Sequence, residues 1–133
     1  MASIHKEVLV NTAADLAWAA MRDVGAVHTR LATGFVTDCK LDGDARVVSF
    51  ANGMRARERI IDIDDGARRL VWSVVGGRLT HHNAAAQVFA EGAGHCRIVW
   101  IADLLPNELA PVIQAMIGQG LVAMKRTLEA APP

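Results

Sequence analysis

The chain has 133 residues and equal numbers of basic and acidic side chains, so its formal net charge is zero. This length predicts a single domain, residues 1–133, that is large enough to bury a core. Without net charge the chain has no long-range field to attract nucleic acid or an anionic membrane, and we expect neither as a partner. The apolar content of 52% suits a protein that lines a cavity as well as filling a core.

Membrane insertion, metal binding and disulfide bonding are all disfavoured by the sequence. No stretch reaches the roughly 18 apolar residues of a membrane span, and the N-terminus lacks the apolar run of a signal peptide. Cys39 and Cys96 are far apart without metal-ligand spacing, so we expect reduced, buried thiols in a cytoplasmic protein. His81 and His82 are adjacent on an expected strand and would point to opposite faces. We therefore predict no metal and no cofactor.

The hydrophobic pattern and the turn signals predict one strand, two short helices, six further strands and a long helix. The expected elements are, in order, a strand at 3–10, helices between 12 and 31, strands at 34–41 and 45–50, three strands between 54 and 91, a strand at 95–104 and a helix at 111–129. Ala51-Asn52-Gly53 is a hairpin signal between two of these strands. Thr12 begins a variant of the capping box at the start of the first helix.

The stretch from Met54 to Phe89 has the clearest pattern, and it predicts three consecutive antiparallel strands. Asp64-Asp65-Gly66 is a turn signal after the first of them. The second strand is rich in β-branched and aromatic residues and ends at Gly76-Gly77.

Alternation along the first of these three strands separates its charged residues onto two faces. Arg55, Arg57 and Arg59 would share one face, which we expect to be solvated, because arginine is costly to bury unpaired. Glu58 would point the other way, towards the interior.

The same stretch resembles the sheet of the helix-grip superfamily, through E-R-I-x-x-I-D-D from Glu58 and V-V-G-G from Val74. That superfamily includes the birch-pollen allergen, START lipid-transfer domains, polyketide cyclases and plant abscisic acid receptors. The bacterial polyketide cyclase/dehydrase-like branch is the most similar, and the resemblance covers nearly the whole chain. It implies an α+β helix-grip fold, in which a seven-stranded antiparallel curved sheet wraps around a long C-terminal helix, with two short helices after the first strand.

The resemblance also implies a ligand cavity between the sheet and the C-terminal helix. Together with strand alternation it suggests these ligand-binding residues: Glu58, Trp72, Val74, His82, Ala84, Ala86, Ile98, Trp100, Val112, Met116 and Gly120. Glu58 and His82 are expected to enter one cavity on the concave face. A buried carboxylate needs a partner, and His82 or an ordered water is the nearest candidate.

Two glycines interrupt the apolar stripe of the C-terminal helix. Gly118 and Gly120 each cost about 1 kcal/mol relative to alanine in a helix interior. They could serve close packing against a strand or a second subunit, or they could leave room for a ligand beneath the helix. Both alternatives stay open at this level.

Three functions are compatible with these observations. The first is binding of a small hydrophobic ligand, such as a polyketide-, isoprenoid- or lipid-like molecule. The second is a polyketide cyclase/dehydrase-type enzyme, with Glu58 and His82 as the candidate catalytic acid and base. The third is a homodimeric protein-interaction module without a ligand.

Overall fold

The computed structural model describes residues 2–132, in which alternating sequence patterns form seven antiparallel strands. The strands are β1 (Ala2–Val10), β2 (Val36–Asp42), β3 (Ala45–Phe50), β4 (Arg55–Asp64), β5 (Arg69–Val75), β6 (His81–Ala90) and β7 (Cys96–Leu105). The helices are α1 (Ala14–Arg22), the π-helical turn η1 (Val27–Leu31), the 3-10 turn η2 (Asn107–Leu109) and α2 (Ala110–Ala130). The strand order is β1-β7-β6-β5-β4-β3-β2. Strands β2 to β7 form a meander, and the last strand, β7, also pairs with the first, β1. This architecture confirms the predicted helix-grip fold.

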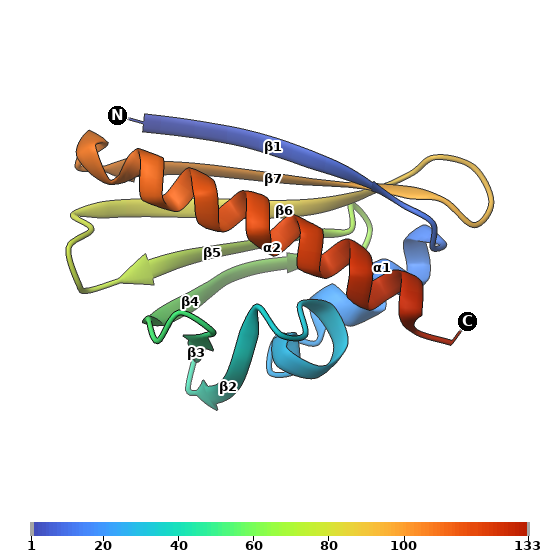
Figure 1. Ribbon diagram of the computed structural model, residues 1–133, viewed down its shortest axis with the longest axis horizontal. Helices are drawn as coiled ribbons and strands as arrows, with labels where there is room; N and C mark the ends of the chain where they lie inside the picture. The colour runs from blue at the N-terminus through green and yellow to red at the C-terminus, as the bar shows by residue number, and fades with distance from the viewer. Residues whose placement is uncertain (1, 133) are drawn as a thin grey trace.

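The sheet curves around α2, which runs diagonally across its concave face (Figure 1). Two β-bulges interrupt the pairing, one between Val36 and Asp38 in β2 and one between Ile60 and Asp62 in β4. A bulge bends its strand and increases the local twist, which helps an otherwise flat sheet to wrap a helix. The bulge in β4 also leaves Ile61 exposed on the outer face, while Ile60 and Ile63 pack against the core.

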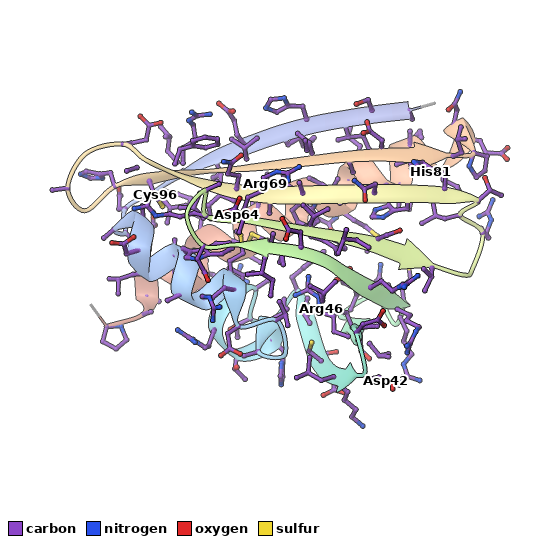
Figure 2. The ribbon with its side chains drawn as sticks, turned by 180° about the vertical axis from the view of Figure 1, so that it is seen from behind. Asp42, Arg46, Asp64, Arg69, His81 and Cys96 are labelled. Atoms are coloured by element: carbon purple, nitrogen blue, oxygen red, sulfur yellow. The ribbon has the colours of Figure 1, made fainter. Side chains whose placement is uncertain are left out.

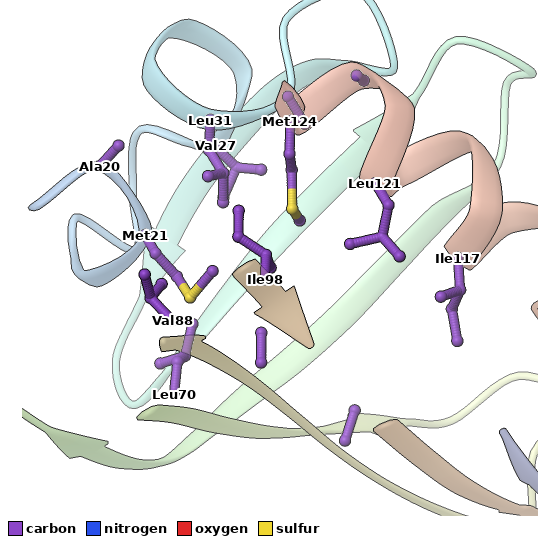
Figure 3. Close-up of a cluster of buried hydrophobic side chains, with 14 of the residues drawn as sticks. Ala20, Met21, Val27, Leu31, Leu70, Val88, Ile98, Ile117, Leu121 and Met124 are labelled. Atoms are coloured by element: carbon purple, nitrogen blue, oxygen red, sulfur yellow. The ribbon is translucent and has the colours of Figure 1, made fainter. Parts of the chain in front are cut away.

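The two short helices close one end of the sheet with apolar side chains. Met21 of α1 packs with Leu70, Val88 and Ile98 of the sheet and with Met124 of α2 (Figure 3). Val88 and Ile98 are almost completely enclosed in this cluster, which forms the core at this end of the molecule.

The start of α1 differs from the predicted capping box. The N-cap residue is Ala13, which makes no side-chain cap. The Thr12 hydroxyl instead donates to the carbonyl of Leu128 at 3.1 Å, near the end of α2. The capping-box prediction is wrong because a carbonyl from the last turn of α2 lies within reach of this hydroxyl.

The two cysteines are free and buried, on β2 and β7, and burial raises the pKa of both thiols. No helix within residues 2–132 is long and apolar enough to cross a membrane.

Candidate functional site

A cavity of about 420 Å³ lies between the concave face of the sheet and α2. Its walls are mainly apolar side chains from β2 to β7, α1, η1 and α2. Met54, Val75 and Val112 line it and are also exposed, so they mark the opening. The opening is therefore framed by the β3–β4 turn, the β5–β6 loop and the first turns of α2.

Two tryptophans form part of the cavity wall above β6. The rings of Trp72 on β5 and Trp100 on β7 meet edge to face, with centroids 5.6 Å apart. Because β6 lies between these two strands, the rings can meet only over its small residues, Ala84 and Ala86. The two alanines thus provide the space that the indole rings occupy.

The structure brings most of the predicted ligand-binding residues to this cavity. Those that line it are Glu58, Trp72, Val74, His82, Ala86, Trp100, Val112 and Met116. Ala84, Ile98 and Gly120 do not line it, although all three are buried. Ala84 pairs with Trp72 in the sheet, and Ile98 belongs to the buried core cluster. A ligand role for the residues that do line the cavity remains a prediction.

Gly120 is excluded from the cavity by close packing. A Cβ atom at this position would lie 2.8 Å from Cζ3 of Trp100 and 3.2 Å from Cε2 of Phe35. Of the two alternatives left open for Gly120, close packing is therefore correct, against Trp100 of β7 and Phe35, and the placement of Gly120 in the cavity wall is wrong. A Cβ atom at Gly118 would meet only Nζ of Lys6, at 3.4 Å, the mobile end of a long side chain.

Alanine at these two glycines should change stability in opposite directions. Gly118→Ala should raise the free energy of unfolding by about 0.5–1 kcal/mol, because alanine loses less conformational freedom in a helix. Gly120→Ala has the same gain in helix propensity, but its Cβ atom must displace the indole ring of Trp100 in a packed region. We therefore expect a net decrease of about 1–2 kcal/mol in the free energy of unfolding. Urea denaturation of both variants measures the difference. Equal stabilisation by both would contradict close packing at Gly120.

A buried ion pair lies at the β3–β4 side of the cavity. Glu58 is 8% exposed, and its Oε1 accepts a hydrogen bond from Nε of Arg46 at 2.8 Å. The two residues are directly opposite each other in the sheet. Nη1 of Arg46 also donates to the carbonyl of Val24 at 3.3 Å, and its guanidinium lies 5.6 Å from the ring centroid of Trp72. The protein partner of Glu58 is thus Arg46 and not His82, because a buried carboxylate is stabilised best by a full positive charge.

His82 lies at the start of β6 and is 9% exposed. Its Nδ1 accepts a hydrogen bond from the backbone N–H of Val74 at 3.0 Å, and its backbone carbonyl accepts one from the Ser73 hydroxyl. Regular pairing between β5 and β6 ends at Trp72 and Ala84, so the imidazole ring replaces a backbone acceptor beyond that point. Burial, with the adjacent His81, lowers the pKa of His82 to about 4, so the ring is neutral at pH 7.

Arg46, Glu58, Val74 and His82 form one row across β3 to β6. Glu58 is paired with Val74, and Val74 is hydrogen-bonded to the His82 ring. Since neighbouring strands are about 4.8 Å apart, the backbones of Glu58 and His82 are separated by about 10 Å. Both side chains line the cavity, yet no hydrogen bond joins them among the described residues. They are two separate polar positions in one apolar cavity.

Sequence reasoning missed Arg46, which Figure 2 shows on β3. The signal was present in the predicted hairpin at Ala51-Asn52-Gly53. In an antiparallel hairpin, residues equally distant from the centre of the turn are opposite each other. Arg46 and Glu58 are each six residues from Asn52, so the hairpin already implies their pairing.

Within residues 2–132, no group of three or more His, Cys, Asp or Glu side chains is placed to hold a metal ion. The buried polar positions of the cavity are an arginine–glutamate pair and a neutral histidine, which offer hydrogen bonds to a ligand.

The fold and the cavity together define a helix-grip protein with an internal apolar pocket. Residues 1–129 match the family model described as "Polyketide cyclase / dehydrase and lipid transport". The chain belongs to this family. No match was found among curated protein sequences.

Solved structures from bacteria and plants have the same fold. A protein from Thermobifida fusca is 27% identical, with 98% of this chain and 91% of that chain covered and a TM-score of 0.76. Norcoclaurine synthase from Thalictrum flavum, solved with a transition-state analogue, is 20% identical, with 96% and 93% covered and a TM-score of 0.72. The di-domain ARO/CYC protein BexL of the BE-7585A biosynthetic pathway is 20% identical, with 97% and 47% covered and a TM-score of 0.76.

Proposed function

We propose that this protein binds a small hydrophobic molecule, polyketide-, isoprenoid- or lipid-like, between the sheet and α2. The observation that carries the proposal is the cavity of about 420 Å³ with its mainly apolar wall. Small-molecule sites are typically concave, about 300–1,000 Å³ in volume, and apolar with a few polar groups that orient the ligand. The proposed ligand contacts are Glu58, Trp72, Val74, His82, Ala86, Trp100, Val112 and Met116.

A neutral fluorescent probe, N-phenyl-naphthylamine, tests this proposal. Wild-type protein should bind it saturably, and metabolite extracts that contain the ligand should displace it. Met116→Trp places a larger side chain in the cavity wall and should weaken binding roughly tenfold, which corresponds to about 1.4 kcal/mol.

Val122→Trp is the matched control, because Val122 lies on the same helix with 61% of its surface exposed. This variant should bind the probe like wild type. Absence of saturable binding to wild type, or equal binding by both tryptophan variants, would contradict a ligand-binding cavity.

A second candidate is an enzyme of the polyketide cyclase/dehydrase type. It is supported by the family description and by Glu58 and His82 lining the same cavity. Aldol cyclisation and dehydration need an acid and a base near a carbonyl, and His82 would take one of these roles. A polyketide synthase gene beside the gene for this protein would favour catalysis, and its absence would favour binding.

The third candidate, a homodimeric interaction module, is tested by the molar mass in solution. A dimer that binds no probe would favour this function. A protein that binds the probe saturably, in either oligomeric state, would favour a ligand-binding role.

A further inference from the structure

The hydrogen bond from Val74 determines which nitrogen of His82 carries the proton. Nδ1 accepts the backbone N–H of Val74 at 3.0 Å, so its lone pair is occupied. In a neutral imidazole one nitrogen is an acceptor and the other a donor. The proton of His82 is therefore on Nε2, which points away from Val74.

Nε2 of His82 is open to the cavity. Two buried side-chain nitrogens in the described residues lack a partner and are shut off from solvent, Nδ1 of His28 and Nε1 of Trp100. Nε2 of His82 is not one of them, and no hydrogen bond joins it to another described residue. Since His82 lines the cavity, its N–H is a donor that a ligand can reach.

The interior of the cavity carries no net charge. The buried polar or charged residues within 2–132 are Arg46, Glu58 and His82. Arg46 and Glu58 neutralise each other, and burial keeps His82 uncharged. A charged ligand group in the interior would lose its hydration without gaining a counter-charge, which is costly.

Apart from Arg46, the arginines that line the cavity lie near its opening, where water weakens their effect. Arg57 is paired with Asp42, and Arg55 is exposed. Arg78 lies in the exposed β5–β6 loop. Charges in contact with water attract an anion weakly compared with buried ones.

We propose that the cavity selects an uncharged ligand whose carbonyl oxygen, or an equivalent acceptor, accepts a hydrogen bond from Nε2–H of His82. This inference rests on the proposed function and adds the chemical class of the ligand. The apolar body of the ligand would lie against Trp72 and Trp100, and its carbonyl would point to the start of β6.

Three naphthalenes substituted at the same ring position test the proposal. Acetylnaphthalene carries a ketone, isopropenylnaphthalene replaces the ketone oxygen by CH₂, and naphthoate is an anion. Their affinities are measured by displacement of N-phenyl-naphthylamine. The informative quantity is the ketone-to-alkene affinity ratio compared between variants, because differences in hydration of the free compounds then cancel.

Two variants separate the two nitrogens of His82. His82→Asn keeps an acceptor near the position of Nδ1, but its shorter side chain has no N–H at the position of Nε2, so the ratio should fall about three- to tenfold, the worth of one hydrogen bond. His82→Gln places an amide N–H near the position of Nε2 and should retain most of the ratio. On wild type, acetylnaphthalene should also shift the Nε2 proton in a proton–nitrogen NMR spectrum, whereas isopropenylnaphthalene should not.

An unchanged ratio in a folded His82→Asn variant would overturn the proposal, as would naphthoate being the tightest ligand. If His82→Asn does not fold, the NMR comparison on wild type decides alone, and equal shifts from both compounds would overturn it. Loss of all probe binding to wild type would instead overturn the proposed function itself. The two failures are thus distinguishable.

Discussion

Arg46→Met should lower the free energy of unfolding by about 3–5 kcal/mol. The side chains of Arg46 and Glu58 are only 5% and 11% exposed, so the substitution leaves a carboxylate buried without its partner. It also removes the hydrogen bond to the Val24 carbonyl and the contact with the Trp72 ring. Urea denaturation at pH 7, compared with wild type, measures the loss.

Two controls identify the buried charge as the cause. Arg59 pairs with Asp44 at 3.2 Å, but their side chains are 56% and 60% exposed, so Arg59→Met should change stability by less than about 1 kcal/mol. The double variant Arg46→Met/Glu58→Leu should recover most of the loss, because no unpaired charge remains buried. A cost for Arg46→Met no larger than that for Arg59→Met would contradict a stabilising role for the pair.

Acidification from pH 6.5 to pH 4 should destabilise the protein by about 3 kcal/mol through His82 alone. Its pKa is lowered from 6.5 to about 4 in the folded protein, first because of burial and then because of His81. Below pH 6.5 the unfolded chain binds a proton at this residue that the folded protein does not bind. The contribution of His82 to the free energy of unfolding is therefore fully present above pH 6.5. It falls with decreasing pH, by at most about 1.4 kcal/mol per pH unit.

The comparison of His82→Gln with His81→Gln isolates this effect. The first variant should lose the pH dependence between pH 6.5 and 5, whereas the second, at an exposed neighbour, should retain most of it. A hydrogen bond from the Arg22 side chain lowers the carboxyl pKa of Asp65, and one from the backbone N–H of Asn11 lowers that of Glu129. Those two carboxyl groups affect stability at lower pH, so the change in stability between pH 6.5 and 5 reports on His82. An equal slope in wild type and His82→Gln would contradict a buried neutral imidazole.

Local pattern predicted the order of strands and helices and the direction of the key polar side chain, and the family resemblance predicted the fold. A period of two and strong turn signals predict a meander of strands, and the resemblance to helix-grip proteins adds the long helix across the sheet. Alternation alone separates Glu58 from the neighbouring arginines, because side chains on one strand must alternate between faces. The structure confirms the interior position of Glu58.

Partners on other strands depend on register, which strand alternation does not specify and which the centre of each turn sets. The pairing of Glu58 with Arg46 follows from the centre of the β3–β4 hairpin. The neutral state of His82 follows from the end of the β5–β6 pairing and from burial.

The boundary between core and cavity was decided only by the tertiary structure. Ile98 and Trp100 share one face of β7, two residues apart, and sequence periodicity treats them alike. Ile98 is fully enclosed in the core cluster and does not line the cavity, whereas Trp100 does. Strand sequence therefore determined which residues face inward. The packing of the helices determined which inward residues contact one another and which line the cavity. This packing depends on the volumes of side chains from elements far apart in the chain.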